Sequence, residues 1–218
     1  IRGDLVTGVP TCALPIYKIG YFLPQVLNAK KVLVGRDIRI SSDEAFAALA
    51  NGLTDAGADV FDAGLSTTPM IYWGTGNFDF DASVMITASH NHKSHNGLKF
   101  SAKNVLPVGY ENGLNRIEHL IESSNPMPKS GISTGSIQPI DLRDDYLRFL
   151  KNYQRDYSGL NIAIDCSNGM AGLFAGMLFG KDAHYLNLKP DGDFPSHEPN
   201  PLDPPNQEQI KQAVLKNS

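Results

Sequence analysis

The hydrophobic pattern of the chain switches repeatedly between two periods. Some segments carry apolar residues at the spacing of an amphipathic helix, and others are short continuous apolar runs bounded by glycine or polar residues, as buried strands are. Up to residue 123 the pattern predicts, in order, a helix over 17–27, a strand over 31–35, a helix over 45–56, a strand over 59–64, a helix opened by residues 66–69 and running through 70–74, a strand over 84–87 and a helix over 111–123. Ser41 or Ser42 is expected to cap the second of these helices. This alternation is typical of a wound α/β sheet whose loops gather at the strand ends.

A second unit with the same plan follows a stretch rich in Pro, Gly and Ser at 124–135. There the pattern predicts a helix over 142–152, a strand over 160–165, a glycine turn at 168–172 that opens a helix ending near Gly180, a strand over 183–188 and a helix over 207–216. We therefore predict two consecutive wound α/β domains, residues 1–135 and 136–218, with mixed, mainly parallel sheets in three-layer αβα order.

The first sixteen residues do not fit this pattern. They show no helical or strand period, and they carry Pro10 and Pro15 where a helix is expected to begin. Residues 6–16 also match the translation of a common sequencing-adaptor read, with Gln expected where Pro10 stands. Our hypothesis is that residues 1–16 are not native; genomic reads that run through their codons would refute it.

Composition limits the kinds of partner. A net charge of −4 argues against nucleic acid or an anionic membrane as the main partner, so an anionic substrate has to be held by local positive groups. Cys12 and Cys166 give neither a disulfide framework nor a paired-cysteine metal site, which suits a reducing cytoplasm. No apolar run approaches the length of a membrane span, and no segment reads as a signal peptide. We expect a cytoplasmic globular protein.

The most informative feature is a short polar loop after the third apolar run. Residues 83–86 are followed by Thr87-Ala88-Ser89-His90-Asn91, and the loop closes at Asn96-Gly97-Leu98-Lys99. It brings a hydroxyl, an imidazole, an amide and an ammonium together, which are the groups needed to hold and pass on a phosphoryl group. The sequence therefore predicts a phosphate-handling site at this strand end.

Ser89 is the residue on which a phosphate is expected. If a helix begins after the strand, its unpaired amides and partial positive charge favour a bound or covalent phosphate. A phosphoserine carries about two negative charges and needs countercharge, which Lys99 supplies together with donors on His90 and Asn91. An ordinary turn whose serine and asparagine cap a helix is the alternative interpretation.

The stretch from Thr87 to Lys99 resembles the phosphoserine loop of the alpha-D-phosphohexomutases, the family of phosphoglucomutase and phosphomannomutase. Further signatures agree with this family in order and spacing from about Tyr17 to the end of the chain: Val34-Gly35-Arg36-Asp37 with Arg39 and Ser41-Ser42, Asp165–Gly172, and Asp191–Pro201. Ile1-Arg2-Gly3 also resembles the start of the family. Because an adaptor origin predicts the same letters, Arg2 is assigned no role.

The resemblance implies roles at the serine loop. Ser89 carries the transferred phosphate, Lys99 moves the proton at the substrate hydroxyl, and His90 supports the substrate or the serine. Asn91, Arg36 and Asp37 are expected to support the loop, with the arginine and the aspartate paired beneath it. A surface ion pair beside a helix cap is the alternative for that pair.

The resemblance also implies an activity. The family interconverts hexose 1-phosphates and hexose 6-phosphates through a phosphoserine and a bisphosphate intermediate, with Mg²⁺ bound in part through the phosphate on Ser89 and with a hexose 1,6-bisphosphate as activator. The family's Mg²⁺ loop follows a further strand beyond Ser218, so we do not expect Asp191-Gly192-Asp193 to be a metal site. We expect a fragment with negligible turnover. The hexose, whether glucose, mannose or glucosamine, the substrate-binding residues and the oligomeric state stay open.

Two other functions fit parts of the sequence. A non-catalytic sugar-phosphate or anion-binding module would use the same loops. A metal hydrolase would use His90, His92 and His95, although nothing else in the sequence completes such a site and His92 stands where the family usually has proline. In the second unit we interpret Asp165 as turn-building and His197 as part of a structural loop.

Overall fold

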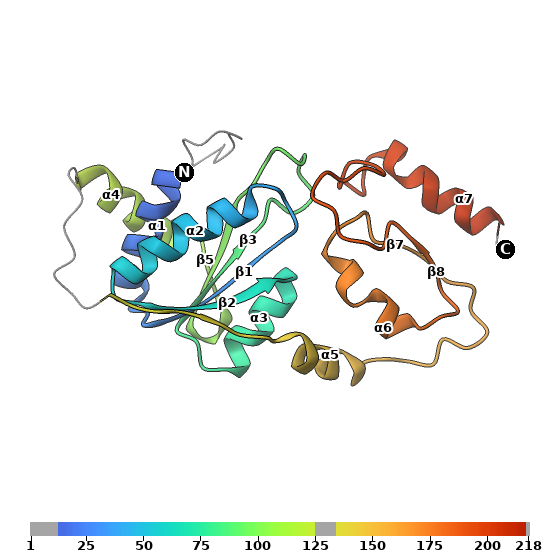
Figure 1. Ribbon diagram of the computed structural model, residues 1–218, viewed down its shortest axis with the longest axis horizontal. Coiled ribbons are helices and arrows are strands. Elements are labelled where there is room, and N and C mark those ends of the chain that lie inside the picture. Colours follow the sequence, from blue (N-terminus) through green and yellow to red (C-terminus); the bar gives the residue numbers. More distant parts are fainter. Residues whose placement is uncertain (1–12, 125–133, 217–218) are drawn as a thin grey trace.

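The computed structural model describes residues 13–124 and 134–216. Figure 1 shows a six-stranded sheet with helices on both faces, followed by a smaller unit that contains a two-stranded sheet. The elements are α1 (Ala13–Leu27), β1 (Lys31–Arg36), α2 (Ser42–Asp55), β2 (Asp59–Leu65), α3 (Thr68–Asn77), β3 (Ala82–Ile86), β4 (Leu98–Ala102), β5 (Leu106–Val108), α4 (Asn115–Ser123), β6 (Ile137–Pro139), α5 (Arg143–Lys151), β7 (Ala163–Asp165), α6 (Ala175–Phe179), β8 (His184–Leu186) and α7 (Glu208–Lys216).

The large sheet has the strand order β5-β4-β3-β1-β2-β6. Strands β1, β2, β3 and β6 are parallel, whereas β4 and β5 are antiparallel to their neighbours. The central strand β1 is buried because both of its faces are covered by helices, which explains its continuous apolar run of Val32-Leu33-Val34. The predicted α/β class with a mixed, mainly parallel sheet is confirmed.

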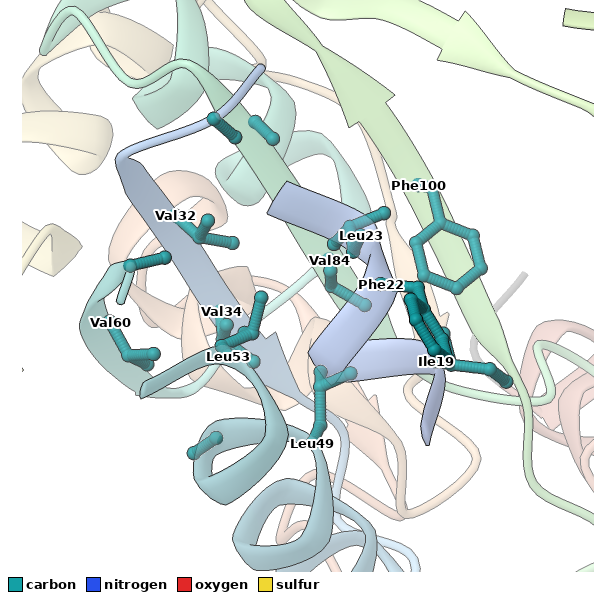
Figure 2. Packing of buried hydrophobic residues seen from close by; sticks show 14 of the residues in the cluster. Ile19, Phe22, Leu23, Val32, Val34, Leu49, Leu53, Val60, Val84 and Phe100 are labelled. Atoms are coloured by element: carbon teal, nitrogen blue, oxygen red, sulfur yellow. The ribbon is translucent and has the colours of Figure 1, made fainter. Parts of the chain in front are cut away.

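One face of the sheet packs against α1, α2 and α4. Figure 2 shows valine side chains of β1, β2 and β3, together with Phe100 of β4, beneath apolar side chains of α1 and α2. Gly20 and Gly52 let these two helices approach closely, because a Cβ on Gly20 would overlap the Leu49 carbonyl and one on Gly52 would overlap the Tyr17 carbonyl. Because α1 starts at Ala13, residues 13–16, which we expected to be irregular, form its first turn, where Pro15 is tolerated. The rest of the suspected adaptor segment, 1–12, lies outside the described residues.

The opposite face packs against α3 and α5. Leu33 and Met85 from the sheet meet Met70 and Ile71 from α3 and the fully buried Leu142, which directly precedes α5. The Trp73 ring of α3 lies 5.5 Å from the ring of Tyr146 and 5.8 Å from that of Phe149, measured between centroids. The three-layer order is therefore helices, sheet, helices.

Residues 137–151 pack with the first unit, although we assigned them to the second. Strand β6 pairs in parallel with β2, and α5 contacts α3. The second sheet starts only at β7, which pairs in parallel with β8. The division into domains at 135/136 stays a prediction. The large sheet nevertheless includes β6, which lies after that point.

Helix α3 has a side-chain cap, whereas the cap expected for α2 does not form. Thr67 caps α3, since its Oγ1 accepts a hydrogen bond from the Met70 amide at 3.2 Å. Ser41 occupies the position before α2 but makes no side-chain capping bond, so the predicted cap is wrong. The hydroxyls of Ser41 and Ser42 instead face Asn96 and Asp37 at the serine loop. Within 13–124 and 134–216, none of the helices is sufficiently long and apolar to cross a bilayer.

Candidate functional site: a serine loop held by a buried arginine

The serine loop connects two antiparallel strands. Strand β3 ends at Ile86, the chain passes through residues 87–97 without forming a helix, and β4 returns with Leu98 opposite Ile86 and Lys99 opposite Met85. The expected helix N-terminus after the strand is therefore wrong. Its physical cause is the alternation from Leu98 to Ala102, which lets β4 pair with β3 at once, so helix amides do not stabilise a phosphate on Ser89.

Ser89 lies at the tip of a tight turn with its side chain exposed. Its φ is 59°, in the left-handed region that costs a non-glycine residue about 1–2 kcal/mol. The turn is fixed by local hydrogen bonds: the Ser89 amide donates to Thr87 Oγ1 at 2.9 Å, and the Asn91 amide donates to the Ala88 carbonyl at 3.1 Å. The serine hydroxyl points outward, 3.4 Å from His90 Nδ1.

Arg39 lies beneath this turn and is 2% exposed. Its Nη2 donates to the carbonyl oxygens of Ser89 at 2.9 Å and Asn91 at 2.8 Å. Its Nη1 donates to those of His92 at 2.8 Å and His95 at 3.0 Å. One side chain from the β1–α2 connection therefore binds four backbone carbonyls of a loop that lies about fifty residues later in the chain.

Asp37 and Ser42 complete the support. Asp37 Oδ2 accepts from Arg39 Nε at 3.1 Å, and its Oδ1 accepts from the Arg39 amide at 3.1 Å and from the Ser42 hydroxyl at 2.8 Å. Asn96, near the other end of the loop, donates through Nδ2 to Ser41 Oγ at 2.9 Å and to Ser42 Oγ at 3.1 Å. Both ends of the loop are thus tied to the same strand–helix connection.

We expected Arg36 to pair with Asp37, but the arginine that pairs with Asp37 is Arg39. Arg36 Nε lies 2.6 Å from Asp43 Oδ1 and its Nη1 lies 2.7 Å from Asp62 Oδ1, and its guanidinium stacks over the Phe46 ring at 4.4 Å. Arg36 ends strand β1 and is directed toward β2 and α2, away from the serine loop. Arg39 lies three residues beyond the end of β1, in the connection to α2, where its guanidinium reaches the loop carbonyls.

Among the described residues, the side chains of Asn91 and Lys99 form no hydrogen bond or ion pair with Ser89. Asn91 is exposed and contributes its backbone to the turn. Lys99 is the second residue of β4; because Phe100 packs toward α1 and α2, Lys99 faces the α3 side of the sheet. Over 13–124 and 134–216, the side chain of Lys99 forms no hydrogen bond or ion pair, so its ammonium is available to a bound anion.

The three loop histidines have different neighbours. His90 is beside Ser89, whereas His92 Nδ1 bonds Ser94 Oγ at 2.8 Å and His92 Nε2 lies 3.4 Å from Glu198 Oε1. The His92 and His95 rings are edge-to-face with centroids 6.1 Å apart. Among the residues that the structure describes, no group of three or more His, Cys, Asp or Glu side chains is placed to hold a metal ion.

The second unit touches the serine loop through residues 191–198. In Figure 1 the green β3–β4 connection meets the orange-red segment of the second unit. Lys93 Nζ lies 3.3 Å from the Asp193 carbonyl oxygen, and the Phe194 ring centroid lies 5.5 Å from Arg39 Cζ. Gly192 is needed at this contact, because a Cβ there would overlap the Ile38 carbonyl. The DGDF part of the second-unit signature therefore lies against the loop support.

His197 and Asp165 anchor that segment to β7. His197 Nε2 lies 3.0 Å from Asp165 Oδ2, and its Nδ1 lies 2.8 Å from the Glu198 carbonyl oxygen. Burial alone lowers the pKa of His197, but these two bonds outweigh it and raise the pKa. Burial has the opposite effect on a carboxylate and by itself raises the pKa of Asp165. Hydrogen bonds from the Ser167 amide, Asn187 and His197 outweigh burial and lower this pKa.

Sequence reasoning named Arg39 as part of a signature but gave it no role, and it missed Thr87 and Asn96 as loop supports. The available signal was the spacing Asp37-Ile38-Arg39 directly after a buried strand, which places a second arginine at the same sheet edge as Ser89. Which of two nearby arginines turns inward is decided by contacts with residues 89–95, and the local sequence does not encode them.

Fold and site together define the class: an α/β protein that presents the exposed Ser89 hydroxyl on a strand-end loop, with an imidazole beside it and a buried guanidinium beneath it. The family profile described as "Phosphoglucomutase/phosphomannomutase, alpha/beta/alpha domain I" matches residues 6–127. Since this match covers more than half of the chain, the chain belongs to the phosphoglucomutase/phosphomannomutase family.

Individual relatives agree. The chain is 33% identical over 210 residues to a phosphomannomutase of Escherichia coli, covering 92% of this chain and 46% of the relative. It is 37% identical over 180 residues to a phosphoglucosamine mutase of Caldicellulosiruptor bescii, covering 79% and 40%. A crystal structure of a phosphoglucomutase/phosphomannomutase family protein from Burkholderia thailandensis superposes with a TM-score of 0.81 at 27% identity, covering 100% of this chain and 48% of that one. The chain thus spans less than half the length of these relatives.

Proposed function

We propose that this chain is the phosphoryl-carrying part of a phosphohexomutase and that Ser89 is the carrier. In the proposed step the Ser89 hydroxyl oxygen attacks a phosphorus atom of a hexose 1,6-bisphosphate. The new Oγ–P bond forms as the bond between that phosphorus and the sugar oxygen breaks, and the serine proton ends on the released sugar hydroxyl. The reverse step at the other hydroxyl moves the phosphate between positions 1 and 6.

The observation that carries this proposal is the exposed hydroxyl of Ser89 on a turn fixed from beneath by Arg39, in a chain of this family. Phosphoryl transfer depends mainly on positioning and on charge neutralisation, and a rigid loop with a solvent-facing alcohol provides the first. The two curated relatives named above are a phosphomannomutase and a phosphoglucosamine mutase, which supports a hexose phosphate as the substrate class.

Two neighbours are proposed to act at the same centre. His90 Nδ1 lies 3.4 Å from the Ser89 hydroxyl, which supports the proposal that it accepts the serine proton as the oxygen attacks. Lys99, whose ammonium has no partner among residues 13–124 and 134–216, is proposed to bind the transferring phosphate and to move the proton at the sugar hydroxyl.

The described residues do not by themselves form a Mg²⁺ site. Carboxylate clusters are the usual protein ligands of this ion, and no group of three or more candidate ligands comes together in the described part of the chain. The Mg²⁺ requirement, with a phosphate on Ser89 as one ligand, stays a prediction, and no step above is routed through the ion. Because the chain spans less than half of its relatives, we also propose that its turnover alone is negligible.

The test measures the hexose monophosphate that is released when the chain takes up a phosphate. The chain is incubated with an excess of glucose 1,6-bisphosphate or mannose 1,6-bisphosphate, and the hexose monophosphate that is released is quantified by phosphorus NMR. We expect release equal to the amount of chain and no more, with the wild type and with Ser94→Ala, an exposed serine of the same loop that serves as the matched control. Ser89→Ala releases none.

Two results contradict the proposal. Binding of the bisphosphate without any release of monophosphate identifies a non-catalytic anion-binding module. Release that continues far beyond one equivalent, or sustained conversion of hexose 1-phosphate to 6-phosphate, contradicts the proposed inactivity of this chain.

A further inference from the structure

We propose that Arg39 is the positioning residue for phosphoryl transfer at Ser89. Its guanidinium lies beneath the turn, donates hydrogen bonds to the loop backbone and to Asp37, and fixes the conformation in which the serine hydroxyl is presented. This inference rests on the proposed function for its catalytic consequence, whereas its structural part is tested separately below.

Every donor of the Arg39 guanidinium is used. The group carries five N–H bonds: Nε donates to Asp37, the two on Nη1 donate to the His92 and His95 carbonyls, and the two on Nη2 donate to the Ser89 and Asn91 carbonyls, all within 2.8–3.1 Å. A lysine ammonium has three donors on a flexible stem and cannot reproduce this planar pattern. The positions of the four loop carbonyls therefore match the geometry of an arginine guanidinium.

The charge of Arg39 is kept inside the protein. Arg39 is 2% exposed, and Asp37, its carboxylate partner, is 7% exposed. Hydrogen bonds from a charged donor are stronger than those between neutral groups, which favours the ordered loop over a solvated one. The Phe194 ring from the second unit lies over the guanidinium at 5.5 Å, so the second unit covers the arginine that holds the loop of the first.

Arg39 affects the geometry of Ser89 because the backbone amide and the backbone carbonyl of Ser89 are both hydrogen-bonded. Its amide donates to Thr87 Oγ1 at 2.9 Å and its carbonyl accepts from Arg39 Nη2 at 2.9 Å. These two bonds keep the left-handed φ of 59° and leave mainly the side-chain rotation of Ser89 free. Without Arg39 the turn is expected to relax toward ordinary φ values, which moves the hydroxyl away from the in-line position that phosphoryl transfer needs.

Arg36 provides a matched control. It comes from the same segment, forms ion pairs with Asp43 and Asp62, and makes no hydrogen bond with the serine loop in the part of the chain that the structure describes. Uptake of phosphate by Ser89 from glucose 1,6-bisphosphate is followed by intact mass for the wild type, Arg39→Lys, Arg39→Gln and Arg36→Gln. A misplacement of the reacting atoms by about 1 Å costs about a hundredfold in rate, so we expect both Arg39 variants to be slowed by about that factor.

The pattern of the kinetics separates positioning from binding. We expect the bisphosphate concentration for half-maximal rate to stay near the wild-type value in Arg39→Lys, because Arg39 is buried and does not reach the substrate, and Arg36→Gln to match the wild type in both parameters. Phosphate uptake by Arg39→Lys at the wild-type rate overturns the inference. An equal slowing in Arg36→Gln also overturns it.

A second measurement is made on the wild type, with Arg36→Gln as the control, and it needs neither a folded Arg39 variant nor phosphoryl transfer. In nitrogen-resolved NMR we expect one arginine whose Nη protons are separate and slow to exchange with water, as a fully bonded and buried guanidinium requires, and this signal persists in Arg36→Gln. A freely rotating, rapidly exchanging Arg39 overturns the inference even if Ser89 is phosphorylated. If no chain takes up phosphate but this signature is present, the proposed function fails and the positioning of the loop by Arg39 stands.

Discussion

Asp37→Ala tests how strongly the loop support depends on the buried ion pair. The change removes the carboxylate that accepts from Arg39 Nε, the Arg39 amide and the Ser42 hydroxyl, and it leaves Arg39 buried without a counterion. Removing one partner of a buried pair costs about 3–5 kcal/mol of folding free energy. We expect a loss in that range for Asp37→Ala.

Asp43→Ala is the matched control for this prediction. Asp43 pairs with Arg36 at 2.6 Å, but its side chain is 85% exposed. Surface ion pairs contribute about 0.2–1 kcal/mol, so the two aspartate variants are expected to differ by about 2–5 kcal/mol. The difference comes from the burial of Asp37 and from the two further hydrogen bonds that it accepts, since both carboxylates pair with an arginine.

Urea unfolding measures the difference. Trp73 is the sole tryptophan of the chain, and its ring contacts Tyr146 and Phe149, so its fluorescence reports the loss of packing between α3 and α5. Far-UV circular dichroism serves as a second probe, and coincident transitions justify a two-state treatment. Unfolding free energies of the two variants that agree within about 0.5 kcal/mol would refute the reasoning, because Arg39 would then not depend on a buried counterion.

Further predictions concern stability at other places. The His197–Asp165 pair is expected to stabilise the fold mainly between about pH 4 and pH 6.5. The pKa of His197 is raised in the folded state, so its contribution is lost as the pH rises through that pKa. The pKa of Asp165 is lowered in the folded state, so its contribution is lost as the pH falls through that pKa. His197→Gln should therefore be most destabilising inside that window in urea titrations, and a pH-independent difference would contradict this. Leu142→Ala, at a fully buried site against Gly74, should cost about 2–5 kcal/mol by the Trp73 signal; an unchanged midpoint would show that α5 is not part of the first core. Gly52→Ala should cost about 1–3 kcal/mol in thermal unfolding because it separates α1 from α2, and a neutral result would contradict their close contact.

The central part of the fold was predictable because its strands are buried on both faces. The apolar runs that become β1 and β3, and the helices that end at glycine or begin at Thr67, carry strong local signals. Strand β6 lacks such a signal: Ile137-Gln138-Pro139 is exposed and short, and it becomes a strand only through pairing with β2. Strand β4 does alternate, but its first residues were interpreted as the closing part of the serine loop.

The site was predictable to the extent that its residues are neighbours in sequence. The motif from Thr87 to Lys99 located the serine and its imidazole, whereas the expectation of a helix terminus failed because β4 pairs immediately with β3. The guanidinium under the loop could not be assigned from the pattern. Arg36 and Arg39 are both close to the strand end, and only the hydrogen bonds of Arg39 to carbonyls fifty to fifty-six residues away distinguish them.

The position of the phosphate tests the account most directly. The chain is treated with glucose 1,6-bisphosphate, digested, and sequenced by tandem mass spectrometry across residues 82–103. The account predicts one phosphoryl group, located on Ser89, absent from Ser89→Ala and retained in Ser94→Ala. Phosphate on any other residue, or an unmodified Ser89 after prolonged exposure to the bisphosphate, would contradict it.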